Sequence, residues 1–248
     1  MATITTRAFV LRSIKYGEAD RILHVFSESH GCIGLFVKAA AKKSRTLGAA
    51  IDPLSLSEIE FRETEQRELL PLRSAESLRL FDGVRTDLEK LSQASFWFDL
   101  LLHLTAPGVA DQELFRLTEL CLAALDESEH GWRVDLTTFF EFHTLRCAGY
   151  ALGFEACLGC GASVDDAQPV CFSISQRAVV HCQRCGAQER NGRPMPRVLR
   201  ALRACAHGVL EPDDDCRPAE HLLRTLLHHV LGRTLKSEAL LDEMSRSM

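Results

Sequence analysis

Two Cys-x-x-Cys pairs constrain the fold of this chain more than any other feature of its sequence. Cys157 and Cys160 form the first pair, Cys182 and Cys185 form the second, and 21 residues separate the two pairs. Four thiolates satisfy the tetrahedral preference of zinc, and each pair supplies two ligands from one tight turn. A glycine follows each pair, where the backbone must turn sharply. The segment between the pairs has the pattern of a hairpin, so the whole stretch predicts a zinc ribbon.

The metal in this ribbon is predicted to be structural. A catalytic zinc keeps an open position and usually has three protein ligands, whereas four cysteines close its coordination shell. Two neighbouring residues remain alternatives, because His181 could displace a cysteine as ligand and Cys171 could replace one. The expected ligands of the Zn²⁺ ion are Cys157, Cys160, Cys182 and Cys185.

Length and composition favour a cytoplasmic protein of more than one unit. The chain has 248 residues, of which 46% are hydrophobic, and this length suits two compact units or two units with a small satellite. The N-terminus lacks the apolar run of a signal peptide, and no window is apolar enough to span a membrane. Because the cytosol keeps thiols reduced, the paired cysteines indicate metal binding rather than disulfides.

The first 75 residues have the pattern of five short strands. The strand-like segments are TRAFVLRS, RILHVFSES, CIGLFVKA, LSLSEIEFR and RELLPLRSA, separated by polar or glycine-bearing turns. The alternation in LSLSEIEFR switches parity partway, which predicts a bulge. Five bent strands favour a small OB-type barrel, although an SH3-like barrel has nearly the same pattern.

From Asp82 onward the apolar residues recur with a helical period. The pattern predicts one helix before a break at residues 106–108, a second over about 112–125, and a third from about 132 to about 153. Beyond the cysteines, Pro194 and Pro196 are expected to open a helix through Ala206, and Pro218 another through about Leu231.

These patterns together predict an α+β multi-domain protein with an N-terminal OB-type barrel, an α-helical domain and an inserted zinc ribbon. The expected boundaries are 1–80 for the barrel, 81–153 and 193–248 for the two parts of the helical domain, and 154–192 for the ribbon.

Charge is unevenly distributed along the chain, although the net charge is only −5. Residues 1–51 hold eight Lys or Arg against three acids, whereas residues 81–150 hold five against twelve. No acid lies between Glu28 and Asp52. Such a segment neutralises phosphates, and about four contacts to a single strand would give a log-affinity versus log-salt slope of about −3. The candidate DNA-binding residues are Arg12, Lys15, Lys38, Lys42, Lys43 and Arg45.

A solvated basic loop without a partner remains the alternative interpretation of this segment. Barrels of this type also stack bases on aromatic residues. Tyr16 falls in a predicted turn where it would be exposed, while Phe9, Phe26 and Phe36 fall on strands and are expected in the core. The motifs of phosphate-binding loops, nucleophile elbows and zinc proteases are missing, so the sequence does not predict an enzyme.

The chain resembles the bacterial RecO family of recombinational repair mediators over nearly its whole length. The resemblance lies in AFVLRSIKYGEADRILHVFSESHGCIGLFVKAAAKKSR, in Asp52-Pro53-Leu54, in the ribbon, and in HLLRTLLHHVLGRTLKSEALLDEM. It implies a non-enzymatic protein with a barrel that binds single- and double-stranded DNA and anneals complementary strands. It also implies cytoplasmic, nucleoid-associated work with RecR and with the acidic tail of single-stranded DNA-binding protein, to help load the RecA recombinase.

The groove for such an acidic tail needs cations at its rim. Arg224, Arg233 and Lys236 have suitable chemistry, with a salt-bridged helix surface as the alternative interpretation. The rival to a DNA-binding mediator is a zinc-ribbon adaptor that uses protein contacts alone, through the acidic helical region. A metal-dependent hydrolase is a third and weaker hypothesis.

Overall fold

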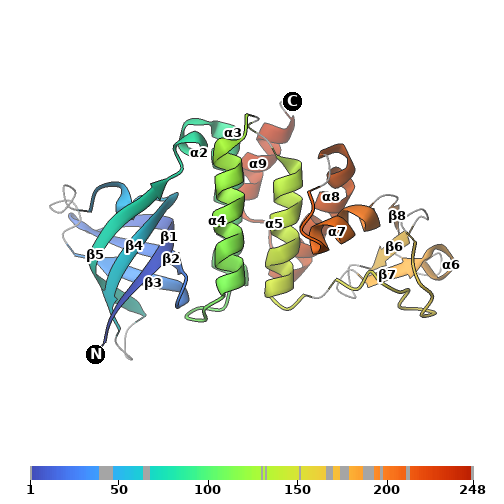
Figure 1. Ribbon diagram of the computed structural model, residues 1–248, viewed down its shortest axis with the longest axis horizontal. Coiled ribbons are helices and arrows are strands. Elements are labelled where there is room, and N and C mark those ends of the chain that lie inside the picture. Colours follow the sequence, from blue (N-terminus) through green and yellow to red (C-terminus); the bar gives the residue numbers. More distant parts are fainter. Residues whose placement is uncertain are drawn as a thin grey trace. The chain divides into compact units, whose positions relative to one another are not determined.

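The computed structural model divides into two compact units (Figure 1). The first unit contains Met1–Gly131 together with Ala239–Met248, and the second contains Trp132–Glu238. The structure describes residues 2–38, 47–63, 68–129, 131, 133–150, 152–165, 170–173, 179–186, 193–195, 198–210 and 213–246.

The first unit begins with a five-stranded barrel. Its strands are β1 (Thr3–Tyr16), β2 (Asp20–Ser27), β3 (Gly31–Val37), β4 (Ser55–Arg62) and β5 (Leu69–Leu80). They close in the order β1-β2-β3-β5-β4, and only the β3–β5 pair is parallel. The short 3-10 helix η1 (Gly48–Ile51) precedes β4 in the chain. A small five-stranded barrel of this kind confirms the predicted OB-type fold.

Alternate residues of each strand fill the barrel because successive side chains point to opposite faces. The buried interior includes Ala8, Val10, Leu23, Val25, Leu35, Val37, Ile59, Phe61, Leu72 and Ala75. Full burial of one large apolar side chain contributes about 1.5–3 kcal/mol. The register shifts in β1 between Val10 and Arg12, and between β4 and β5 at Leu56 and Ser57, where the sequence predicted a bulge. These shifts bend the strands and let them close.

Gly31 shows why one turn of the barrel requires glycine. Its φ is +58°, and a Cβ built on it would lie 2.0 Å from the carbonyl oxygen of Val109. Any other residue at this position would be strained and would push the 106–109 segment away from β3.

Three helices follow the barrel in the chain and belong to the first unit. They are α2 (Asp82–Thr86), α3 (Leu88–Leu104) and α4 (Gln112–Glu127). The Asp87 side chain caps α3 by accepting from two backbone N–H groups, and Asp111 caps α4 in the same way with one. Phe115 of α4 packs on Phe9 and Phe26 of the barrel, with ring centroids 5.0 and 5.8 Å away. The helices therefore cover one end of the outer face of β1 and β2.

The second unit combines helices with a small sheet. Helix α5 (Val134–Cys147) packs against α7 (Val198–Ala206) and α8 (Asp213–Leu231). Strands β6 (Val170–Ser173), β7 (Val179–Cys182) and β8 (Arg193–Met195) form a sheet in the order β7-β6-β8, and α6 (Gln183–Gly186) follows β7. Helix α9 (Lys236–Arg246) ends the described chain.

Two proline predictions for this unit were wrong. Pro194 lies in β8 rather than at a helix start, and α7 begins at Val198. Helix α8 begins at Asp213, so Pro218 lies inside it. The helix therefore extends beyond the proline that was expected to start it.

Candidate nucleic-acid interface and metal centre

The outer face of β1, β2 and β3 carries rows of side chains that run across the strands. Leu23, Val25 and Leu35 point into the core, so their even-numbered neighbours on β2 and β3 point outward. One row pairs Ile14 of β1 with Ile22 of β2 and Phe36 of β3, and Phe36 pairs onward with Pro71 of β5. The next row joins Arg12, His24, Gly34 and Leu69. We call this surface the β1–β3 face.

The β1–β3 face is covered at one end only, within the described residues. Phe9 and Phe26 are fully buried under the helices, whereas Ile14 is 41% exposed and Tyr16 is 57% exposed. Tyr16 is the last residue of β1, so its prediction as a turn residue was wrong, although it is exposed as expected. Its ring stands edge-on to that of Phe36, with centroids 6.0 Å apart and an interplanar angle of 83°. Phe36 is only half-buried and is not a core residue.

Three of the predicted DNA-binding residues lie on or beside this face. Arg12 is exposed and donates to Asp99 of α3 at 3.0 Å. Lys15 pairs with Arg21, and Arg21 pairs with the inward-facing Val37, so Lys15 is not in the outward rows. It lies at the end of the barrel and is exposed. Lys38 is exposed and directly follows β3. The other three predicted residues, Lys42, Lys43 and Arg45, lie outside the described residues.

His24 adds no positive charge to the face near neutral pH. Burial lowers the pKa of His24 below its ordinary value, and the nearby Arg12 guanidinium lowers it further. The imidazole therefore stays neutral until the solution is more acidic than an ordinary histidine requires.

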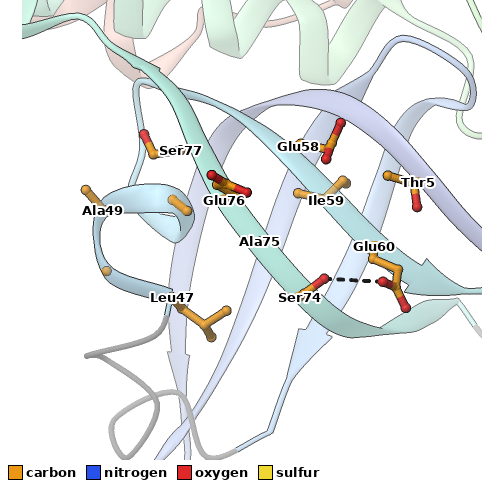
Figure 2. A pocket seen from close by; sticks show the side chains of 12 residues that line it. Thr5, Leu47, Ala49, Glu58, Ile59, Glu60, Ser74, Ala75, Glu76 and Ser77 are labelled. Atoms are coloured by element: carbon orange, nitrogen blue, oxygen red, sulfur yellow. Dashed lines mark hydrogen bonds between the residues drawn. The ribbon is translucent and has the colours of Figure 1, made fainter.

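The outer face of β4 and β5 has the opposite charge. It forms a pocket of about 600 Å³ between these strands and η1, and none of the described residues that line it is basic. Figure 2 shows Glu58, Glu60 and Glu76 at this pocket, with the Ser74 hydroxyl donating to Glu60 at 3.5 Å. Glu58 and Glu76 are directly opposite each other in the β4–β5 ladder. We call this surface the β4–β5 face, and a phosphate backbone would be repelled by it.

A smaller hollow of about 400 Å³ lies at the edge of the β1–β3 face. Phe36, Leu69 and Pro71 line it together with Glu68. A Cβ on Gly34 would lie 2.7 Å from the Leu69 side chain, so glycine at this position lets Leu69 pack flat on β3. The hollow is therefore mainly apolar, with one carboxylate at its rim.

The four predicted cysteines come together in the second unit. The sulfur atoms of Cys157, Cys160, Cys182 and Cys185 all lie within 4.8 Å of one another. The Sγ atoms of Cys160 and Cys182 are 3.8 Å apart. A tetrahedral zinc with Zn–S distances of about 2.3 Å requires S···S separations of about 3.8 Å. The donor set and its spacing therefore fit a metal ion of this kind.

Local backbone geometry favours the thiolate form of one ligand. Burial of Cys157 opposes its ionisation, but the backbone N–H groups of Cys182, Cys160 and Gly159 donate to its sulfur and lower its pKa to about 6. The Gly161 N–H donates to the Cys157 carbonyl at 2.8 Å and closes the first turn. The backbone thus favours the ionised form of Cys157 that binds metal, whereas hydrogen bonds with Cys182 and Cys160 raise the pKa of Cys185 to about 12.

The two alternative ligands lie beside the group and are not part of it. Cys171 and His181 are paired across β6 and β7, and both are buried. Neither ring nitrogen of His181 has a hydrogen-bond partner among the described residues. A Cβ on Gly159 would lie 3.2 Å from the Cys185 sulfur and 3.6 Å from His181 Nδ1, so the imidazole is close to the cysteines. Such a buried, unpaired ring is chemically suited to donate to a metal-bound thiolate.

Arg224 lies in a buried cluster of charges, unlike the other predicted partner-binding cations. It donates to Glu220 at 2.7 Å and lies 3.5 Å from Glu141. Burial raises the pKa of Glu141 to about 8, although Arg224 acts in the opposite direction. Arg233 and Lys236 are exposed near the start of α9.

An OB-type barrel joined to helices and to a four-cysteine centre defines a multi-domain α+β protein whose barrel has the architecture of oligonucleotide-binding domains. Residues 1–81 match the family model described as the recombination protein O N-terminal domain, and residues 85–239 match the model of its C-terminal domain. The chain therefore belongs to the recombination protein O family.

Two similar proteins match nearly the whole chain, and a third matches about two thirds of it. A protein named DNA repair protein RecO from Anaeromyxobacter sp. (strain K) is 31% identical over 98% of this chain and 98% of its own length. The protein of the same name from Syntrophus aciditrophicus is 26% identical over 99% of this chain and 97% of its own length. That of Rubrobacter xylanophilus is 35% identical over 66% of this chain and 64% of its own length. Within the described residues, no helix is long and apolar enough to cross a membrane.

Sequence reasoning missed two features of the site. It did not assign the apolar row of the β1–β3 face, nor the acidic β4–β5 face. The acidic face was detectable from alternation, because Glu58 and Glu60 share one parity on β4. The apolar row was not, because Ile14 and Tyr16 share the parity of the inward Ala8 and Val10 and turn outward only through the register shift after Val10.

Proposed function

We propose that this protein is a non-catalytic DNA-binding mediator of recombination in DNA repair. In this proposal the barrel binds single- and double-stranded DNA and anneals complementary strands. The protein then helps to load RecA on DNA coated by single-stranded DNA-binding protein, together with RecR. Membership of the recombination protein O family supports the repair role.

The observation that carries the proposal is the contrast between the two faces of the barrel. The β1–β3 face presents Arg12 and Lys38 beside exposed Ile14 and Tyr16, whereas the β4–β5 face presents three glutamates. A polyanion is attracted to the first face and repelled by the second. The binding surface for DNA is therefore the β1–β3 face and the acid-free segment that follows it.

The segment 39–46 contributes Lys42, Lys43 and Arg45 in this proposal, on the strength of its sequence alone. A triple variant in which Glu replaces each of these three residues is expected to bind a fluorescent oligonucleotide more weakly. The affinity of this variant is also expected to depend less on salt. Removing one phosphate interaction with a single strand flattens the log–log slope by about 0.7. Unchanged affinity at two salt concentrations would remove the segment from the interface.

A control reverses one cation on another strand of the barrel. Arg62 is the last residue of β4, the strand that carries Glu58 and Glu60, so Arg62→Glu alters the net charge of the barrel away from the β1–β3 face. This variant is expected to bind the oligonucleotide as the unchanged protein does.

Contact with the acidic tail of single-stranded DNA-binding protein is assigned to the exposed cations Arg233 and Lys236. Arg224 is left out of this assignment, because its guanidinium is already engaged by carboxylates inside the helical unit. Annealing of oligonucleotides coated by that protein, with and without its tail, tests the proposal. Annealing that is equally fast without the tail would contradict the role of the tail.

The metal is proposed to be a structural Zn²⁺ held by Cys157, Cys160, Cys182 and Cys185. Four thiolates leave no open position for substrate, so the ion would supply folding stability rather than chemistry. Metal analysis of the purified protein is expected to give about one zinc per chain. Hydrolase activity that a chelator abolishes would overturn the non-catalytic proposal.

The alternative function is a protein–protein adaptor without direct contact to DNA. The excess of acids over residues 81–150 is the observation that favours it. An adaptor would fail to anneal bare oligonucleotides, so an annealing assay without single-stranded DNA-binding protein separates the two functions.

A further inference from the structure

An apolar row crosses four strands of the barrel where the helices do not cover it. It consists of Ile14, Ile22, Phe36 and Pro71, which are paired in register from β1 through β2 and β3 to β5. Adjacent strands lie about 4.8 Å apart, so the row is about 14 Å long. Tyr16 lies beside the row and rests edge-on against Phe36.

At the other end of the β1–β3 face, helix α4 covers the outward aromatic side chains. There Phe9 and Phe26 are fully buried beneath Phe115 of α4. At the uncovered end, Ile14 is 41% and Tyr16 is 57% exposed among the described residues. Contiguous apolar side chains left in contact with water mark a binding surface.

The chemistry around the row specifies its occupant. Arg12 lies in the row between the apolar row and the end of the face that the helices cover. Lys38 lies two residues beyond Phe36, on the other side of the apolar row. Cations on both sides of an apolar and aromatic strip match a ligand with flat apolar rings on a negatively charged backbone. Single-stranded nucleic acid has this structure, because its unpaired bases are free to stack on aromatic side chains.

Acids at the edge of the row disfavour a duplex. Glu18 and Asp20 lie in and after the turn that follows Tyr16, and Glu68 lines the hollow beside Phe36. A duplex presents two phosphate backbones and keeps its bases paired inside, so it would meet these acids without gaining stacking.

We propose that Tyr16 and the row formed by Ile14, Ile22, Phe36 and Pro71 bind unpaired bases, with one base stacked on the Tyr16 ring. This inference rests on the proposed function and deepens it. The row makes the barrel prefer single strands over duplexes, while the cations supply affinity for any nucleic acid.

The test compares two substitutions of Tyr16 on two ligands of equal charge. The ligands are a short oligothymidylate and an abasic deoxyribose-phosphate strand of the same length. Tyr16→Phe keeps the ring and is expected to bind both as the unchanged protein does. Tyr16→Leu keeps apolar area but loses the ring, and is expected to bind oligothymidylate about 5- to 100-fold more weakly while binding the abasic strand equally well.

A matched control removes apolar area elsewhere on the barrel. Leu78 is 50% exposed on β5 and belongs to neither the row nor its rim, so Leu78→Ala is expected to leave binding of both ligands unchanged. Unchanged thermal melting of each variant shows that the barrel is folded, as expected for a substitution at an exposed side chain.

Each outcome decides the inference. Tyr16→Leu that binds oligothymidylate as tightly as the unchanged protein, or that loses affinity equally on the abasic strand, would overturn the stacking role and leave the proposed DNA binding intact. If the unchanged protein bound neither ligand, both the stacking role and the proposed function would be wrong.

Discussion

The two outer faces of one small barrel differ in chemistry although one closed five-stranded sheet carries both. The β1–β3 face exposes aromatic and branched side chains between cations, and the β4–β5 face exposes three glutamates around a pocket. Both faces share one apolar interior. The fold therefore depends on the inward residues, and the choice of partner depends on the outward residues.

This contrast also shows why the net charge of the chain is a poor guide to its partner. A ligand responds to the local field, and the two faces present fields of opposite sign within one domain. In the proposed function, the acidic face would repel a polyanion that the face with Arg12 and Lys38 attracts.

Removing the metal should change the second unit and leave both barrel faces as they are. Structural zinc contributes about 10–16 kcal/mol of binding free energy to small zinc-binding domains, so chelation or Cys185→Ser should abolish the ribbon fold. Limited proteolysis within residues 154–192 measures this loss, and oligonucleotide affinity measured in parallel should be unchanged. A parallel loss of affinity would show that the binding surface includes the ribbon.

Reversing two cations beside the β1–β3 face should weaken binding of single strands. Lys15 and Lys38 are both exposed. Lys15→Glu with Lys38→Glu should remove two phosphate interactions and flatten the log-affinity versus log-salt slope by about 1.4. Fluorescence anisotropy over a salt series measures the slope, with the single reversal Arg62→Glu on β4 as control. An equal effect per reversed charge in the control and in the double variant would mean that only net charge matters.

Neutralising the β4–β5 face should stabilise the barrel. Glu58 and Glu76 are directly opposite in the ladder, and like charges at such positions are destabilising. Glu58→Gln with Glu76→Gln should raise the free energy of unfolding by about 0.2–1 kcal/mol. Thermal melting at low salt measures the gain, which high salt should reduce. A loss of stability would show that these carboxylates have a favourable partner.

His24 should give the smallest effect, and only in acid. The pKa of His24 is lowered by burial and by Arg12, so its positive charge is gained only as the pH falls below the ordinary range for histidine. Affinity for a single strand should therefore be the same at pH 8 and pH 7 and should rise slightly at pH 5. His24→Gln should remove that rise. A rise already present near pH 7 would contradict the lowered pKa.

Sequence patterns predicted the fold well where they reported local geometry. Alternation gave the five strands and the bulge in β4, and the spacing of the cysteines gave the ligand set that the structure brings together. Sequence patterns were less reliable where one residue was taken to mark the start of a helix. Pro218 has the chemistry of a helix start, yet α8 begins at Asp213 and continues through this proline.

The candidate site was predictable only in part. Charge identified Arg12, Lys15 and Lys38, because a cation is visible in a sequence without its neighbours. The apolar row depends on register, and register is set by pairing between distant strands. For that reason Phe36 was assigned to the core. Its exposure depends on where the helices stop covering β1 and β2, which no local pattern reports.

The most direct test of the account is to locate a bound single strand on the barrel. An oligonucleotide carrying 5-iodouracil forms crosslinks to nearby aromatic residues under ultraviolet light, and mass spectrometry identifies the linked peptides. Crosslinks are expected at Tyr16 and at Phe36. In Tyr16→Leu the crosslink at residue 16 should be lost. Crosslinks confined to β4 and β5, or to the ribbon at residues 154–192, would contradict the account.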